Sequence, residues 1–232
     1  MGNIFITPQW FFGYDILLEM MFAVIALLVC FYSWKIYKIS QENHLRLFSW
    51  AFLFIGLSYI VQSSLNFIIF SNLDDVVSGA INLQSVYHLT LFGIYLHSIL
   101  FLLGLLLLAY ISLKIDNIRA FVLLLLLTFS TLYFSPYKTF ILYLLSTILL
   151  LFTSYYYLTT YLVNRKLTTL MIFFAMLFLF VSNISFILAT DKSLYYVIGH
   201  ILELVAYILV LGSLLIILKV GKQKHKNGKK TR

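Results

Sequence analysis

The sequence has few of the residues that soluble proteins place on their surfaces. Only 10% of its 232 residues are charged, 62% are hydrophobic, and the whole chain contains two prolines. A water-soluble domain of this length needs a far larger share of polar residues. The composition therefore excludes a soluble globular domain and indicates an integral membrane protein.

Cysteine is almost absent as well. Cys30 is the single cysteine, which excludes an intrachain disulfide and any cysteine-rich metal motif. The motifs of intramembrane hydrolases are also missing, because HExxH, HxxxH and paired catalytic aspartates do not occur and no Ser-His-Asp arrangement stands out. We therefore expect that the protein is not an enzyme.

Seven hydrophobic runs are long enough to cross about 30 Å of hydrocarbon. They cover residues 12–36, 46–70, 85–113, 119–135, 138–163, 167–189 and 194–219, and the fourth is the shortest. We predict an all-α polytopic membrane protein with seven transmembrane helices. Its transmembrane domain would cover 1–220, followed by a basic cytoplasmic tail over 221–232.

Basic residues indicate how these helices are oriented. Of the 16 lysines and arginines, only Lys138 and Lys192 fall on the side that the N-terminus occupies. This asymmetry predicts an external N-terminus, a cytoplasmic C-terminus and a location in the cell membrane. The same asymmetry accounts for the net charge of +8, so no binding to nucleic acid is expected. We expect the tail to contact anionic lipid head groups, and a membrane or cytoplasmic protein partner stays open.

Two parts of the chain have the same layout. The stretch YSWKIYKISQENHLRLFSW and the stretch YYYLTTYLVNRKLTTLMIF each show a Tyr-rich helix end, a short basic loop and a new apolar helix. Helices 1–3 and 5–7 would then be parallel repeats joined by helix 4, with the repeat axis along the membrane normal.

This 3+1+3 layout resembles that of the SWEET-type sugar transporters and, more distantly, that of the microbial rhodopsins. The chain departs from both families, because Pro8-Gln9 precedes the first helix and the seventh helix has no mid-depth lysine for retinal. Runs similar to LEMMFAVIALLVCFYSWKIYK and GHILELVAYILVL recur in small prokaryotic seven-helix membrane proteins. That resemblance covers nearly the whole chain and implies the fold, without an activity or a cofactor.

Helical periodicity predicts which faces of three helices are turned inward. The inward residues of the first helix are Asp15, Glu19, Phe22, Ala23, Ala26, Cys30 and Ser33, and those of the seventh are Tyr196, Gly199, His200, Glu203, Ala206, Tyr207 and Ser213. The third helix has a small-residue face, typical of close packing, made of Thr90, Gly93, His97 and Gly104. Leu102 and Leu106 are predicted to face outward.

Carboxylates within the membrane are the main functional signal, because a charge at that depth costs several kcal/mol. Glu19 lies about two turns below the outer boundary of the membrane, and His200 and Glu203 lie at a similar depth. We predict an outward-side polar pocket whose ligand-binding residues are Glu19, His97, His200, Glu203 and Asp15. Gln62, Asn66 and Asn183 are interpreted as interhelical hydrogen-bonding residues.

Such a pocket would suit a cation, a proton or a small polar solute, bound for transport or for sensing. A redox protein is an alternative, with haem or a metal held by His88, His97 and His200. Histidine and carboxylate sets suit several metals without selecting one, so the cofactor and the metal stay unknown. A second alternative is a membrane scaffold or assembly factor without a ligand.

Overall fold

The computed structural model describes residues 8–11, 13–71, 83–113 and 117–230, and within these ranges every regular element is a helix. A short 3₁₀ helix, η1 (Gln9–Phe11), precedes the first long helix. The long helices are α1 (Tyr14–Ser40), α2 (Asn43–Ser71), α4 (Leu83–Leu113), α5 (Ile118–Phe134), α6 (Lys138–Asn164), α7 (Leu167–Leu188) and α8 (Leu194–Lys230).

Six of these helices are long and apolar enough to cross a membrane, namely α1, α2, α4, α6, α7 and α8. The 27 residues of α1 give it a length of about 40 Å at a rise of about 1.5 Å per residue. Helix α5 is apolar but has only 17 residues, which corresponds to about 25 Å. The prediction of an all-α, multi-pass membrane protein is therefore confirmed.

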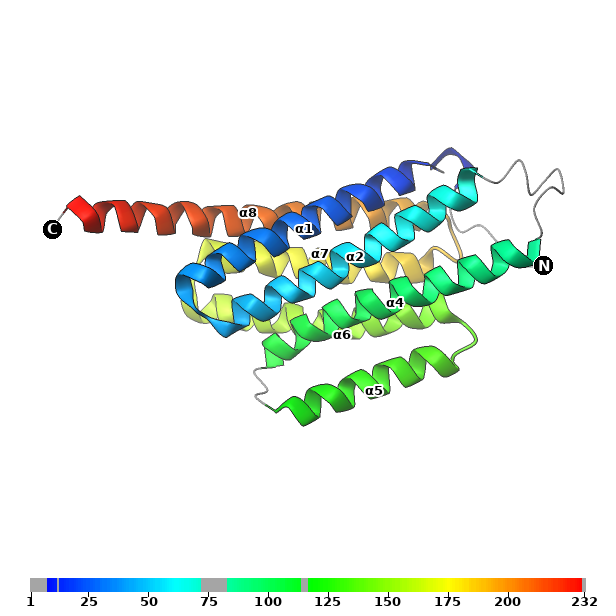
Figure 1. The fold of residues 1–232 in the computed structure, drawn as a ribbon, viewed down its shortest axis with the longest axis horizontal. Helices are drawn as coiled ribbons and strands as arrows, with labels where there is room; N and C mark the ends of the chain where they lie inside the picture. The colour runs from blue at the N-terminus through cyan, green and yellow to red at the C-terminus, as the bar shows by residue number, and fades with distance from the viewer. Residues whose placement is uncertain (1–7, 12, 72–82, 114–116, 231–232) are drawn as a thin grey trace.

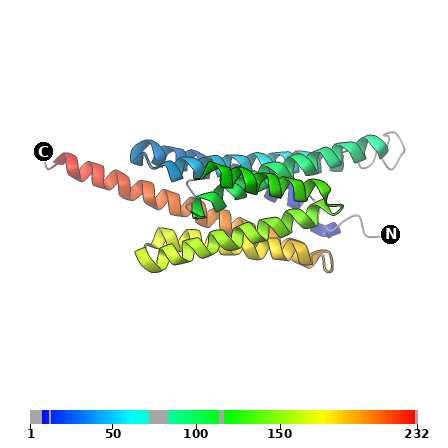
Figure 2. The ribbon, with the colours of Figure 1, turned by 90° about the horizontal axis from the view of Figure 1, so that it is seen from below.

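The six long helices form a closed ring. Contacts run from α1 to α2, α4, α6, α7 and α8 in turn, and α8 contacts α1 again. Helix α5 contacts α4 and α6, and Figure 1 shows it at the edge of the bundle. Figure 2 shows α1, α2 and α4 in one layer and α6 and α7 in a second, with α8 running obliquely. All six ring helices contribute side chains to one apolar core.

The helices alternate in direction along the chain (Figure 1). Helices α1, α4, α6 and α8 begin at the same end of the bundle, which we call the near end, and α2, α5 and α7 begin at the far end (Figure 1). Helix α8 continues as a single helix to Lys230, past the boundary predicted at residue 220, and projects beyond the far end (Figure 1).

Two tight turns at the far end join α1 to α2 and α6 to α7. Gln41 and Arg165 end α1 and α6 in the left-handed conformation, with φ of 58° and 51°. Each backbone N–H donates to a tyrosine carbonyl four residues earlier, Tyr37 and Tyr161, at 2.8 Å. Such a cap stops a helix and reverses the chain within a few residues. Each pair of helices is therefore an antiparallel hairpin.

The inward faces predicted for α1 and α8 are confirmed for most residues. On α1, Asp15, Glu19, Phe22, Ala23, Ala26 and Ser33 are buried, and Cys30 is half-buried. Its thiol lies 3.3 Å from the hydroxyl of Ser49 on α2. On α8, Gly199, His200, Glu203, Ala206, Tyr207 and Ser213 are buried, and Tyr196 is half-buried.

The face prediction for α4 is right on one side and wrong on the other. Gly93 and Gly104 do contact α2, against Leu65 and Ile55. Leu102 and Leu106, predicted to face outward, are 0% and 1% exposed. The reason is that α4 lies between α2 and α6 in the ring and therefore buries two faces instead of one.

Candidate functional site

A small polar cavity lies in the near half of the ring, with a volume of about 40 Å³. All six ring helices contribute to its wall, which consists of Glu19, Tyr59, Gln62, His97, Phe101, Tyr143, Phe186, Tyr196, His200 and Glu203. The space suits a bare ion or about one to three water molecules. The structure thus brings Glu19, His97, His200 and Glu203, four of the five predicted site residues, to one cavity.

Asp15 is the predicted site residue that the structure does not bring there. Its side chain is buried, but the carboxylate accepts hydrogen bonds from the backbone N–H groups of Gly13 and Ile16, both at 2.9 Å. Asp15 therefore holds the start of α1 in place, where a negative charge also favours the helix N-terminus.

Glu19 has an amide partner from the neighbouring helix. Nδ2 of Asn66 on α2 lies 3.0 Å from Oε1 and 2.9 Å from Oε2 of Glu19. The amide therefore donates to the carboxylate across the α1–α2 interface. Asn66 does link two helices, as predicted, but its partner is a residue of the cavity.

Glu203 ends a short chain of hydroxyl groups. The Tyr207 hydroxyl donates to that of Tyr59 at 3.2 Å, and the Tyr59 hydroxyl donates to Oε1 of Glu203 at 3.0 Å. All three side chains are buried, with exposures of 5% or less. These two hydroxyl groups orient Glu203, and the hydrogen bonds extend from the cavity toward the middle of the bundle.

His200 lies beside Glu203 without a hydrogen bond to it. Its Nδ1 is 3.6 Å from Oε2 of Glu203, close enough for an ion pair if the ring is protonated. Neither ring nitrogen has a hydrogen-bond partner among the described residues, although both are buried. Four aromatic rings surround the imidazole at centroid distances of 4.6–5.9 Å, those of Phe11, Phe22, Phe186 and Tyr196. This environment holds the imidazole next to the carboxylate and leaves its nitrogens available to a small guest.

His97 contributes to the cavity from α4. Its Nδ1 is 3.0 Å from the backbone carbonyl oxygen of Ser58, which can only accept a hydrogen bond. Nδ1 is therefore assigned the proton, which leaves Nε2 as an acceptor in the neutral ring. The ring stacks on Phe101 at 5.7 Å. His97 is thus fixed in orientation by both α2 and its own helix.

Four polar residues of the cavity were not predicted as site residues: Tyr59, Gln62, Tyr143 and Tyr196. A helical spacing was present on α2, because Tyr59, Gln62 and Asn66 follow one another by three and four positions. The chain contains 17 tyrosines, so the sequence does not distinguish a tyrosine of a site from the tyrosines of the core and of the membrane interface.

The redox alternative finds little support in this geometry. No three His, Cys, Asp or Glu side chains are grouped closely enough to hold a metal ion within the ranges that the structure describes. His88 is exposed and does not line the cavity. A cavity of about 40 Å³ is also too small for haem.

A second and larger hollow, which we call the chamber, lies at the far end of the ring. Its volume is about 610 Å³, and its lining again comes from all six ring helices. Thr160, Lys166, Thr168 and Thr169 contribute polar groups, while Phe48, Ile111, Ile172 and Leu214 contribute apolar ones.

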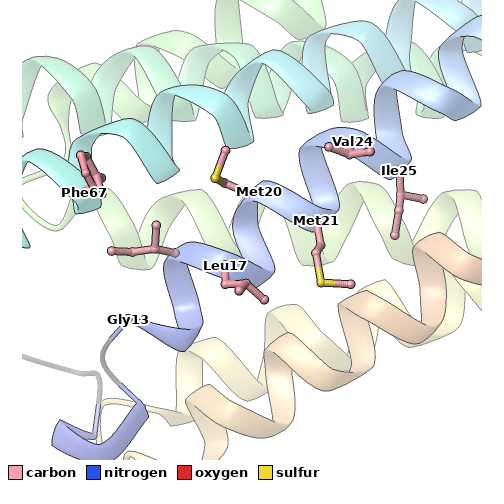
Figure 3. A pocket seen from close by; sticks show the side chains of 8 residues that line it. Gly13, Leu17, Met20, Met21, Val24, Ile25 and Phe67 are labelled. Atoms are coloured by element: carbon pink, nitrogen blue, oxygen red, sulfur yellow. The ribbon is translucent and has the colours of Figure 1, made fainter.

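A third hollow is a shallow groove on the outer surface of α1. Seven of its lining residues come from the first half of α1 or directly precede it, and Phe67 comes from α2. Figure 3 shows Leu17, Met20, Met21 and Val24 along this face, with only carbon and sulfur atoms at their side-chain ends. Such a surface suits the acyl chains of a bilayer, and it offers no group for a polar ligand.

Comparison with known proteins gives no further guide. No family model matches the chain, no curated protein is significantly similar to it, and no solved structure has a significantly similar fold.

Proposed function

We propose that the protein is a seven-span membrane transporter that binds a proton or a small monovalent cation in the polar cavity. One observation carries this proposal: Glu19 from α1 and Glu203 from α8 line the same buried space of about 40 Å³, with His200 beside them. Two carboxylates in such a space cannot both carry an uncompensated charge. A proton or a small cation provides the compensation.

The surrounding contacts support ion binding over a purely structural role. Asn66 supplies hydrogen bonds to Glu19, Tyr59 supplies one to Glu203, and both leave the carboxylates turned toward the cavity that they line. Here two acids share one space with an imidazole whose nitrogens have no hydrogen-bond partner among the described residues, so a charge bound at one of these groups acts electrostatically on the other two.

The direction of the helices supports seven spans. Helices α4 and α6 both run from the near end to the far end (Figure 1). The ammonium of Lys138, at the start of α6, lies 5.1 Å from the ring of Tyr95 in the first half of α4, which agrees with parallel helices. If α4 and α6 both span, the chain must cross the membrane between them. Helix α5 runs from the far end to the near end, which is the direction that such a crossing requires (Figure 1). It is short, and it lies at the edge of the bundle instead of in the ring.

Equivalent residues of the α1–α2 and α6–α7 hairpins support the parallel repeat for the first two helices of each repeat. Gln41 and Arg165 occupy the same turn in the two hairpins, and several other pairs are separated by the same sequence interval. The pairs Phe22/Ser146, Ala26/Leu150, Val29/Thr153, Phe52/Met176, Ile55/Leu179 and Ser58/Ser182 are buried in both members. Two more such pairs, Glu19/Tyr143 and Gln62/Phe186, line the cavity. Transporters built from repeats bind their ligands where the repeats meet.

The orientation follows from the charges of the two ends. We assign the near end to the outside and the far end to the cytoplasm, because Lys35, Lys38, Arg46, Arg165 and Lys166 lie at the far end. A tag before Met1 should then be external and a tag after Arg232 cytoplasmic. Protease accessibility in sealed vesicles tests this directly, and two tags on the same side would mean an even number of spans.

Infrared titration of the reconstituted protein tests the ion site without knowledge of a transported solute. The carbonyl stretching band of protonated carboxyl groups should change with pH in two coupled steps. Glu203→Gln should remove part of this band and alter the remaining step, and Glu19→Gln should do the same. Asp191→Asn is the matched control, because it removes an exposed carboxylate outside the cavity and should leave the steps unchanged.

Repeating the titration with added Na⁺ or K⁺ separates the two proposed ligands. A cation that occupies the cavity should displace the proton and move both titration steps to lower pH. If the site binds only protons, the added salt should leave both steps unchanged. An unchanged carboxyl band in both the Glu19→Gln and Glu203→Gln variants would refute ion binding at the cavity. The scaffold alternative would then explain the bundle better.

A further inference from the structure

The chamber at the far end has the dimensions of a ligand site. Its volume of about 610 Å³ falls within the range of about 300–1,000 Å³ typical of small-molecule sites. Its walls combine apolar side chains, among them Phe48, Ile111 and Leu214, with the hydroxyl-bearing Thr160 and Thr169. The polar cavity near Glu203, with a volume of about 40 Å³, is much too small for a small-molecule ligand. The chamber is therefore a candidate ligand site separate from the cavity.

Two opposite charges line this chamber from opposite hairpins. Glu42 lies in the α1–α2 turn, and Lys166 lies in the α6–α7 turn. They are separated by the same sequence interval as Gln41 and Arg165, so they occupy equivalent positions of the two hairpins. Other equivalent pairs also line the chamber, namely Ile36/Thr160, His44/Thr168, Leu45/Thr169 and Phe48/Ile172.

The two charges do not neutralise each other. Glu42 approaches His44 of its own hairpin at 3.2 Å, and no ion pair within 4.0 Å joins it to Lys166 among the residues that the structure describes. Across a chamber of this size, a carboxylate and an ammonium are therefore presented to whatever enters.

We propose that the chamber binds a small zwitterion with an apolar side group, a ligand of the amino-acid type. Lys166 receives the carboxylate of the ligand, Glu42 receives its ammonium group, and the apolar wall around Ile111 and Leu214 receives the side group. A zwitterion leaves no charge unpaired at either position, whereas a simple anion would face Glu42 and a simple amine would face Lys166.

This inference names the solute class for the proposed transporter and rests on that function for its biological meaning. Binding at the chamber is nevertheless measured separately from titration of the cavity. A failure at one site can therefore be distinguished from a failure at the other.

The test compares three probes of nearly the same shape. Leucine carries both charges, 4-methylpentanoate lacks the ammonium group, and 3-methylbutylamine lacks the carboxylate. Isothermal titration calorimetry on the protein in nanodiscs of neutral phosphatidylcholine, with empty nanodiscs as the baseline, gives the affinity of each. Leucine should bind up to about fivefold more tightly than either analogue, because Glu42 and Lys166 are exposed and a solvent-exposed ion pair contributes up to about 1 kcal/mol.

Charge reversal at the two equivalent positions makes the test sharper. Glu42→Lys and Lys166→Glu should each lower leucine affinity at least about tenfold. The double variant, which exchanges the two charges, should recover most of it with the ligand turned around. Lys38→Glu is the control, because it reverses a charge at the same end on an exposed residue that does not line the chamber.

Three results would overturn the proposal: equal affinities for the three probes, no binding of leucine, or a double variant no better than the single ones. Tight binding of 4-methylpentanoate together with insensitivity to Glu42→Lys would instead identify an anion site. The infrared titration of the cavity, unchanged in all chamber variants, would show that they fold.

Discussion

Substituting Gly104 by alanine probes the packing that holds His97 at the cavity. A Cβ atom at this position would meet Cγ1 of Ile55 at 2.6 Å and the backbone oxygen of Ala51 at 2.7 Å. A side chain can rotate away, but a backbone oxygen cannot, so α2 and α4 must separate by several tenths of an ångström. We expect Gly104→Ala to be clearly destabilising.

The magnitude follows from two opposing terms. Overpacking of a closely packed interior costs about 1–3 kcal/mol, and the higher helix propensity of alanine returns up to about 1 kcal/mol. The net loss in free energy of unfolding should therefore reach about 2 kcal/mol. Gly212→Ala is the control, because its Cβ would meet only the terminal methyl of Met171, at 3.2 Å. That variant should be neutral or stabilised by up to about 1 kcal/mol.

The measurement is reversible unfolding in mixed micelles with increasing SDS, followed by circular dichroism. Gly93→Ala provides an internal comparison, because the three atoms nearest to its new methyl group all belong to the side chain of Leu65, which has other rotamers. The expected order of stability is Gly212→Ala, then Gly93→Ala, then Gly104→Ala. A Gly104→Ala protein as stable as the unmodified one would refute the close α2–α4 contact.

Three further variants test individual contacts. Asn66→Ala should lower the free energy of unfolding in the same assay by about 1.5–3 kcal/mol, because Glu19 loses its amide donor on both oxygens. Asn183→Ala should cost less than about 1 kcal/mol, since its amide donates to the Leu179 carbonyl of its own helix and to no other helix among the described residues. Lys138→Met should speed proteolysis between α5 and α6, because the ammonium donates to two carbonyls at the end of α5; an unchanged cleavage rate would contradict a role in fixing α5.

The fold could be predicted to a large extent because hydrophobic length is a strong signal in membrane proteins. The last run was predicted to begin at residue 194, where α8 begins, and the run at 138–163 corresponds to α6 at Lys138–Asn164. Inward faces could be predicted wherever polar or small residues mark them, as Glu19 does on α1 and Glu203 does on α8. Intramembrane carboxylates avoid lipid, so their position alone orients a helix.

Leu102 and Leu106 show where that reasoning fails. Lipid tails are as apolar as leucine, so a leucine pattern does not distinguish a face against lipid from a face against another helix. The position of α4 between two neighbours was decided by the order of helices in the ring, which no local pattern encodes. Tyr59 shows a related limit, because its role depends on Glu203, which is distant in the sequence and adjacent only in the fold.

Helix α8 is one of the six ring helices that line both the cavity and the chamber. It places Glu203 at the cavity and Leu214 in the chamber wall, with Tyr207 between them. From Tyr207 to Leu214 the distance along the helix is about 10 Å, and no α8 residue between Glu203 and Leu214 lines either hollow. The cavity and the chamber are therefore separate hollows in this arrangement. Coupling between the two sites, which the proposed transport requires, must then act through movement of the ring helices that line both, such as α8 against its ring neighbours α1 and α7.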